Sequence, residues 1–143
     1  DVAPSRGLGD VYKRQIVDIP GVSEIFHEGY VTYSNEAKER LLGVAPETIS
    51  DYGVVSRQTA AEMAAGAAKT AHTMIALSST GVAGPDGGTK EHPVGDVYLG
   101  CCYNGSVMTQ HMLGCGSRTE IRQQAVAAAF SLLEKMLTEE KIL

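Results

Sequence analysis

The feature that most constrains the fold is a pair of strand-like runs joined by Asn104 and Gly105. The runs read DVYLGCCY over residues 96–103 and SVMTQHML over residues 106–113. An Asn-Gly pair between two such runs favours a two-residue turn, because both residues tolerate the positive φ that this turn requires. The sequence therefore predicts an antiparallel hairpin, and the fold must contain a sheet.

The segment before the hairpin is long and rich in glycine. TMIALSS over residues 73–79 has the length of a buried strand, and SSTGVAGPDGGTKEHPVG occupies residues 78–95. A connection of this length inside a compact chain is either functional or a floppy surface loop. Pro85 and Pro93 each fix their own φ, which stiffens the loop and favours a functional role. We expect the glycines to let a ligand approach main-chain N–H groups.

Several other segments have the pattern of helices or strands. The predicted helices are 35–43, capped by Ser34 or Asn35 and ended by Gly43; 56–72, capped by Ser56; and 118 to about 139, with Ser117 and Glu120 as a capping box. YVTYS over residues 30–34 is β-branched and aromatic, which predicts a strand before the first helix. Strands, a hairpin and interleaved helices together predict an α/β sandwich with a mixed sheet.

The composition argues against several classes of protein. A formal net charge of −5 disfavours binding of nucleic acid through a basic face. No run approaches the roughly 20 apolar residues of a membrane span, and no signal peptide is visible. The cysteines, at 101, 102 and 115, and the scattered histidines lack the spacing of a disulfide framework or a metal site. We expect a single cytoplasmic domain with no metal or other cofactor, and with the adjacent cysteines on opposite faces of a strand.

Two polar stretches are candidates for binding or chemistry. GCGSR over residues 114–118 leads into the last helix, where free N–H groups and the helix dipole favour anions. Arg118 either binds such an anion or pairs with Glu120 in water. Ser34 and Lys38 lie four residues apart, on one helix face. Lys38 is either a general base with a lowered pKa or a solvated charge beside a capping serine, and the residues alone favour the second interpretation.

Three stretches resemble the CinA C-terminal domain family. They are YVTYSNEAKERLLGV from residue 30, STGVAGPDGGTKEHPVG from residue 79, and the Gly-Ser-Arg entry to the last helix. The resemblance covers about residues 16 to 140 and implies a three-layer α/β/α sandwich. The family includes bacterial nicotinamide-nucleotide amidohydrolases, so the implied reaction converts nicotinamide mononucleotide (NMN) to nicotinate mononucleotide and ammonia, with a serine nucleophile and a lysine base. The alternative is a non-catalytic nucleotide-binding or assembly domain of a competence or damage-inducible protein.

The resemblance also implies roles for individual residues. The catalytic roles fall on Lys38 and Tyr33. The substrate-binding roles fall on Thr80, Gly81, Gly84, Pro85, Ser117 and Arg118. His92 stands where the family often has lysine. The implied partner is a small pyridine nucleotide, with no nucleic acid and no membrane, and a homo-oligomer is compatible with this interpretation.

The beginning of the chain, DVAPSRGLGDVYKRQ, does not resemble the family. The family's nucleophilic serine lies in a T-A-E-S-C-T-G-G segment, and this segment does not occur in the sequence. We expect residues 1–15 to be a disordered tail outside the family. We expect residues 16–143 to form one CinA C-terminal-like domain without its first helix and strand, and the chain as given to lack amidohydrolase activity.

Overall fold

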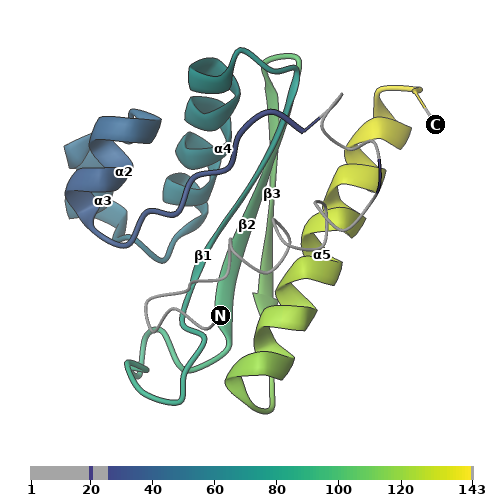
Figure 1. Ribbon diagram of the computed structural model, residues 1–143. Helices are drawn as coiled ribbons and strands as arrows, with labels where there is room; N and C mark the ends of the chain where they lie inside the picture. The colour runs from purple at the N-terminus through teal and green to yellow at the C-terminus, as the bar shows by residue number, and fades with distance from the viewer. Residues whose placement is uncertain (1–19, 21–25, 143) are drawn as a thin grey trace.

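The computed structural model describes residue 20 and residues 26–142. In chain order the elements are α2 (Asn35–Leu42), α3 (Pro46–Tyr52), α4 (Arg57–Ala71), β1 (Ile75–Gly81), β2 (Asp96–Tyr103), β3 (Ser106–Leu113) and α5 (Arg118–Glu139). Figure 1 shows three layers, in which α2, α3 and α4 lie on one side of the sheet and α5 lies on the other. The predicted α/β/α sandwich is therefore confirmed.

The sheet has three strands in the order β1-β2-β3, and both neighbouring pairs are antiparallel. The hairpin turn falls at Asn104 and Gly105, with φ values of 48° and 89° as the Asn-Gly pattern predicts. The part of the sheet that the structure describes has no parallel pairing, so the mixed sheet is not found there.

Residues 30–34 are not a strand, contrary to the prediction from their β-branched and aromatic side chains. The carbonyl of Thr32 accepts a hydrogen bond from the side chain of Lys38, and Ser34 caps α2. Polar groups of this segment therefore serve the following helix instead of a neighbouring strand. This is a case of tertiary context deciding against intrinsic β-propensity.

The helix boundaries follow the capping residues of the sequence. The Ser34 hydroxyl accepts a hydrogen bond from the N–H of Ala37, and Gly43 ends α2 with a φ of 68°. Ser56 caps α4, and Ser117 forms the predicted capping box with Glu120 at the start of α5. Helix α3 was not predicted, although a proline in its first turn is a typical start signal.

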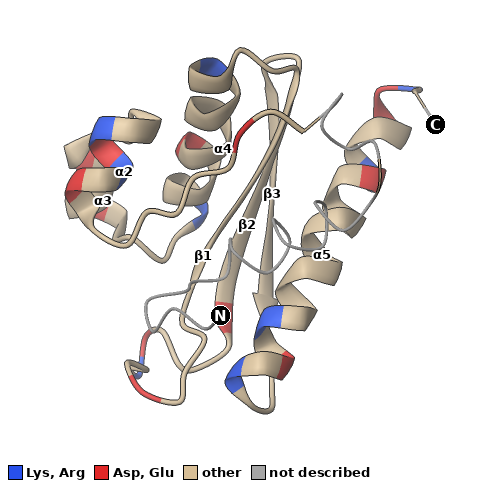
Figure 2. Cartoon of the chain, in the orientation of Figure 1, with Lys and Arg blue, Asp and Glu red and all other residues tan. Residues whose placement is uncertain are grey.

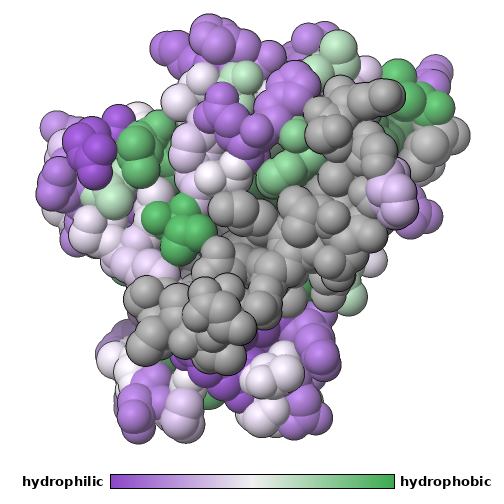
Figure 3. Space-filling model, in the orientation of Figure 1, coloured by the Kyte–Doolittle hydropathy of each residue, from purple (hydrophilic) through white to green (hydrophobic). Residues whose placement is uncertain are grey.

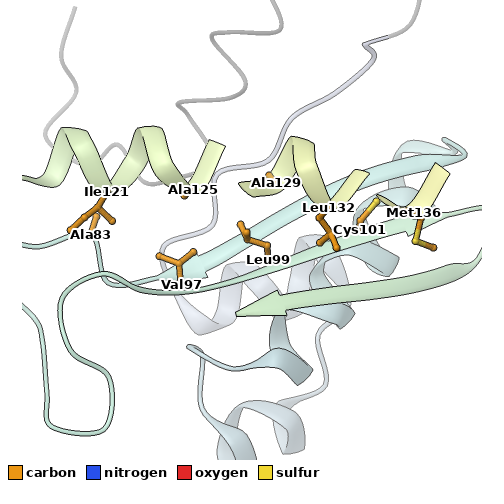
Figure 4. Packing of buried hydrophobic residues seen from close by; sticks show 9 residues of the cluster. All are labelled: Ala83, Val97, Leu99, Cys101, Ile121, Ala125, Ala129, Leu132 and Met136. Carbon is orange, nitrogen blue, oxygen red and sulfur yellow. The ribbon is translucent and has the colours of Figure 1, made fainter. Parts of the chain in front are cut away.

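The main hydrophobic core lies between β2 and α5 (Figure 4). Every second residue of β2 faces this core, and Val97, Leu99 and Cys101 are each 0% exposed. Their partners on α5 include Ile121, Ala125, Ala129, Leu132 and Met136. Cys102 faces the other way and packs with Ala64 and Ala68 of α4. The adjacent cysteines therefore lie on opposite faces of the strand, as predicted.

Helix α2 is held on α4 by a close approach of the two backbones. A Cβ atom at Gly66 of α4 would lie 1.6 Å from the carbonyl oxygen of Leu42. Next to this contact, the Thr70 hydroxyl donates a hydrogen bond to the carbonyl of Leu41 at 3.1 Å. The absence of a side chain at Gly66 thus lets α2, the helix that carries Lys38, lie directly on α4.

Charged residues and exposed hydrophobic residues are distributed differently over the described chain. Most charged residues of the described chain belong to helices and loops (Figure 2), and Asp96 is the one Asp, Glu, Lys or Arg residue in the three described strands. On the face shown in Figure 3, the exposed hydrophobic residues form separate areas. No helix within residues 26–142 combines the length and the apolar character needed to cross a membrane.

Candidate functional site

Lys38 lies on the buried face of α2. Lys38 is 6% exposed, and its Nζ donates a hydrogen bond to the carbonyl of Thr32 at 2.9 Å. Burial lowers the pKa of the Lys38 amine, because removal of water disfavours the charged form. A lower pKa increases the population of neutral amine, which is the form that can accept a proton. The structure therefore shows a buried amine and not the solvated charge that the residues alone favoured, whereas the role of Lys38 as a base stays a prediction.

The two residues before α2 flank this lysine differently. Tyr33 is exposed, directly before the helix cap. The Ser34 hydroxyl accepts a hydrogen bond from the N–H of Ala37 at 3.0 Å, which is the capping role. Among the described residues, no serine hydroxyl is hydrogen-bonded to the Lys38 amine. In the part that the structure describes, the Lys38 amine thus has no serine hydroxyl as a hydrogen-bond partner, and its role as a base stays a prediction.

The glycine-rich loop, defined as residues 82–95, closes on itself at its base. The N–H of Gly95 donates to the carbonyl of Val82 at 2.7 Å, and the N–H of Val82 donates to the carbonyl of Asp96 at 3.0 Å. Gly84 has a φ of 77°, and a Cβ atom there would lie 2.5 Å from the side chain of Val94. Glycine is therefore required at this position by the packing of the loop, and its role toward a ligand stays a prediction.

Thr80 and Gly81 end β1 next to this loop. Thr80 is buried, and its hydroxyl donates a hydrogen bond to the carbonyl of Val54 at 2.7 Å. A Cβ atom at Gly81 would lie 2.6 Å from the carbonyl oxygen of Asp96. Both residues thus have structural roles that join β1 to its neighbours.

Arg118 connects α5 to the glycine-rich loop. Its Nη1 donates a hydrogen bond to the carbonyl of Gly84 at 2.6 Å, which places Arg118 beside Gly84 and the adjacent Pro85. The Ser117 hydroxyl accepts from the N–H of Glu120 at 3.2 Å, and the Glu120 carboxylate accepts from the N–H of Ser117 at 2.9 Å. Ser117 is therefore engaged in the cap, whereas the Arg118 guanidinium reaches toward the loop.

A cluster of His92, Asp96 and His111 was not predicted from the sequence. Asp96 is 4% exposed, and its carboxylate is hydrogen-bonded to His92 Nδ1 at 2.8 Å and to His111 Nε2. The His111 ring stacks on Tyr98, with the ring centroids 4.4 Å apart. The hairpin register pairs Tyr98 with His111, so the predicted turn could have placed these two residues side by side. Nothing in the sequence placed His92 of the loop beside them.

The two histidines determine the charge state of Asp96. Burial alone raises the pKa of the Asp96 carboxyl, but the hydrogen bonds and charges of His111 and His92 outweigh it, so that the pKa is lowered. The Asp96 carboxylate therefore stays charged at pH values below the range in which aspartate usually gains a proton. Within the described residues, no group of three or more His, Cys, Asp or Glu residues has an arrangement that could hold a metal ion.

The predicted site residues thus form two groups. Thr80, Gly81, Gly84, Pro85, Ser117 and Arg118 lie around the base of the glycine-rich loop, and Lys38 and Tyr33 lie at the start of α2. The hydrogen bonds of Lys38, Thr80 and Arg118 described above go to the main-chain carbonyls of Thr32, Val54 and Gly84, respectively. Whether they face one ligand stays a prediction.

The fold and these residues define an α/β/α domain with a buried lysine on a short helix and a glycine-rich loop at one end of the sheet. The profile of the CinA C-terminal domain family matches residues 6–137. The chain belongs to this family. The match begins at residue 6, whereas the sequence analysis expected the family domain to begin at residue 16. Residues 1–15 lie outside the described residues, so their predicted disorder stays a prediction.

The similar proteins with known sequences are longer than this chain. A protein of Clostridium acetobutylicum that is named as competence-damage inducible is 52% identical over 127 residues, which cover 89% of this chain and 31% of that protein. A CinA-like protein of Kosmotoga olearia is 48% identical over 129 residues, which cover 90% of this chain and 31% of that protein. The chain therefore spans about a third of the length of these relatives.

Solved structures agree with the family and the fold. The competence/damage inducible protein CihA from Agrobacterium tumefaciens superposes with a TM-score of 0.85 at 42% identity, over 90% of this chain and 79% of that one. A competence or damage-inducible protein from Enterobacter asburiae superposes with a TM-score of 0.86 at 32% identity, over 91% of this chain and 82% of that one. The chain is thus a CinA-family domain of the kind found in competence/damage-inducible proteins.

Proposed function

We propose that this domain belongs to an amidohydrolase that converts NMN to nicotinate mononucleotide and ammonia. The observation that carries the proposal is the state of the Lys38 amine. It is buried, it makes its described hydrogen bond to a main-chain carbonyl, and its pKa is lowered. A purely structural surface lysine has none of these properties, whereas a lysine that acts as a base depends on a lowered pKa.

In the proposed mechanism, Lys38 removes the proton from a serine hydroxyl, and the serine oxygen attacks the carboxamide carbon of the substrate. The C–N bond then breaks, and the nitrogen leaves as ammonia with the proton that Lys38 returns. Water hydrolyses the resulting acyl-serine to the carboxylate. The serine is expected from the T-A-E-S-C-T-G-G segment, so we propose that the 143-residue chain alone does not turn over NMN.

The substrate phosphate is assigned to Arg118 in this proposal, and the pyridine nucleotide is assigned to the wall formed by Thr80, Gly81, Gly84 and Pro85. Support comes from the hydrogen bond between Arg118 and Gly84, which holds the guanidinium at the base of the loop. A charge-assisted hydrogen bond contributes about 1.5–3 kcal/mol. Ser117 is engaged in the capping box, so the phosphate contact depends on Arg118.

A measurement of ammonia release from NMN tests the reaction. The chain is compared with a version extended at its start by a family segment that contains T-A-E-S-C-T-G-G. We expect activity in the extended version, none in the chain alone, and none in extended Lys38→Ala. Extended Lys69→Ala is the matched control, because Lys69 is an exposed lysine of α4. Full activity of extended Lys38→Ala would contradict the assigned base.

Calorimetry on the same extended version tests the phosphate contact. Arg118→Ala should weaken NMN binding about tenfold or more and spare nicotinamide riboside, which lacks the phosphate. Arg57→Ala, at an exposed arginine that begins α4, is the control. Equal weakening of nucleotide and nucleoside would show that Arg118 does not hold the phosphate.

The alternative is a non-catalytic nucleotide-binding or assembly domain. It is favoured by the absence of a serine hydroxyl beside Lys38 among the described residues, and by the competence-damage names of the longer relatives. The extended version separates the two functions. NMN binding without ammonia release would support the binding domain, and release that depends on Lys38 would support the amidohydrolase.

A further inference from the structure

The tip of the glycine-rich loop, defined as residues 86–93, is attached to the sheet differently from the loop's base. The base is fixed by main-chain hydrogen bonds, among them Gly114 N–H to the Gly95 carbonyl at 2.8 Å. The last residue of the tip, Pro93, accepts a main-chain hydrogen bond from the N–H of Asp96 at 3.0 Å. Before it, the tip makes a turn of its own, in which Thr89 and His92 bond to each other at 2.9 and 3.0 Å. In the described part of the chain, the bond between His92 and Asp96 is the one side-chain hydrogen bond that joins the tip to the sheet.

We propose that Asp96 is the latch of this tip: its carboxylate binds His92 of the loop and His111 of β3 at once, so the tip is closed on the sheet while the carboxylate is charged and opens when that charge is removed. The role is a positioning role, since Asp96 acts on the loop through His92. The inference concerns the shape of the loop and does not depend on the proposed reaction.

The geometry distinguishes a fixed end and a movable end of the latch. His111 lies on β3 and stacks on Tyr98, so the sheet holds its ring in place. His92 lies on the loop, and its ring is held by Asp96 through Nδ1. A buried carboxylate is unfavourable without hydrogen-bond partners, so Asp96 favours the conformation in which both imidazoles reach it. Loss of the Asp96 charge therefore releases the tip and not the strand.

The two imidazoles are the described side-chain partners of Asp96, and the other charged groups near the cluster bind elsewhere or are exposed. Within the described residues, His111 and His92 act on the pKa of Asp96 beside burial. On the other packed elements, Glu62 of α4 binds Thr48 and the N–H of Ala45, Glu120 of α5 belongs to the cap, and Arg118 binds Gly84. On the tip itself, Asp86, Lys90 and Glu91 are exposed. The latch thus depends on the charge of Asp96.

The sign of the pH effect follows from the lowered pKa of Asp96. The unfolded value for aspartate is about 3.9. A carboxyl whose folded pKa lies below this value contributes its stabilisation in full above it, and loses it as the pH falls through the folded pKa. The tip is therefore closed at neutral pH and opens in acid.

Limited digestion of the 143-residue chain by trypsin tests the latch, because Lys90 lies in the exposed tip. Cleavage after Lys90 should accelerate about tenfold or more in Asp96→Asn, the factor expected for loss of one hydrogen bond to a charged group. His92→Ala should give the same acceleration and leaves the strand residue intact, in case Asp96→Asn does not fold. Cleavage after Lys69 in α4 reports global unfolding and should not change.

Asp86→Asn is the matched control, since it removes an exposed carboxylate from the same tip. It should cleave like the parent. As a second measurement, the amide resonances of Gly87 and Gly88 should shift in acid, below the usual aspartate range, in the parent and in Asp86→Asn but not in Asp96→Asn. Unchanged cleavage after Lys90 in both latch variants, or equal acceleration after Lys69, would overturn the proposal.

Discussion

Gly66→Ala tests whether α2, the helix that carries Lys38, lies directly on α4. A Cβ atom at this position would lie 1.6 Å from the carbonyl oxygen of Leu42. Ordinary contacts between non-bonded heavy atoms have separations of about 3.5 Å. The obstacle is a main-chain atom, so no change of side-chain rotamer relieves it. Helix α2 must move away from α4, and Lys38 moves with it.

The expected magnitude comes from two opposing effects. Alanine in place of glycine inside a helix gains about 1 kcal/mol from helix propensity. Overpacking of a close contact costs about 1–3 kcal/mol, and a backbone displacement lies at the upper end of this range. We therefore expect a net loss of about 1–2 kcal/mol in the free energy of unfolding, which corresponds to a decrease of about 3–8 °C in Tm for a chain of this size.

Urea denaturation and thermal melting measure this difference. Ala65→Gly is the control, since Ala65 is exposed on the same helix and its substitution changes propensity alone, by about 1 kcal/mol in the destabilising direction. The close packing of α2 on α4 thus predicts that both substitutions destabilise. If Gly66→Ala instead stabilises the protein by about 1 kcal/mol, helix propensity alone explains the change in the free energy of unfolding, and the close packing of α2 on α4 is refuted.

Two further substitutions test the core and the buried amine. Leu99→Ala should reduce the free energy of unfolding by about 2–5 kcal/mol because Leu99 is fully buried against α5, and Leu113→Ala at an exposed position should change it by less than about 0.5 kcal/mol; equal effects in urea denaturation would contradict the core. Lys38→Met should be at least as stable as the parent at neutral pH. Since the folded pKa of Lys38 lies below its unfolded value, the unfolded chain binds more protons between the two, and parental stability rises with pH in that window. The variant should lack this rise.

Local signals in the sequence predicted much of the fold. The Asn104-Gly105 turn, the Ser56 cap and the capping box at Ser117 each depend on residues close together in the chain, and each is confirmed. The prediction of a strand at residues 30–34 was wrong. The side chains of this segment suit a strand, but the carbonyl of Thr32 accepts a hydrogen bond from Lys38 of the following helix. Local patterns determine helix ends and turns, but the partners of an extended segment depend on tertiary contacts.

The candidate site was predictable only in part. The resemblance to a family pointed to Lys38, but the residues alone favoured a solvated charge, because burial of an amine on a short helix depends on what α2 packs against. The cluster around Asp96 joins a loop, a strand start and the next strand, so its members are brought together by the register of the hairpin. Such contacts are long-range and leave no local pattern.

Titration of the Lys38 Nζ tests most directly whether this buried amine is able to accept a proton. NMR of lysine labelled with ¹³C at Cε follows each amine through the neutral and alkaline range, and the resonance absent from Lys38→Met identifies Lys38. We predict a midpoint below the usual lysine value of about 10.4. A midpoint at or above that value would contradict the assignment of Lys38 as the base.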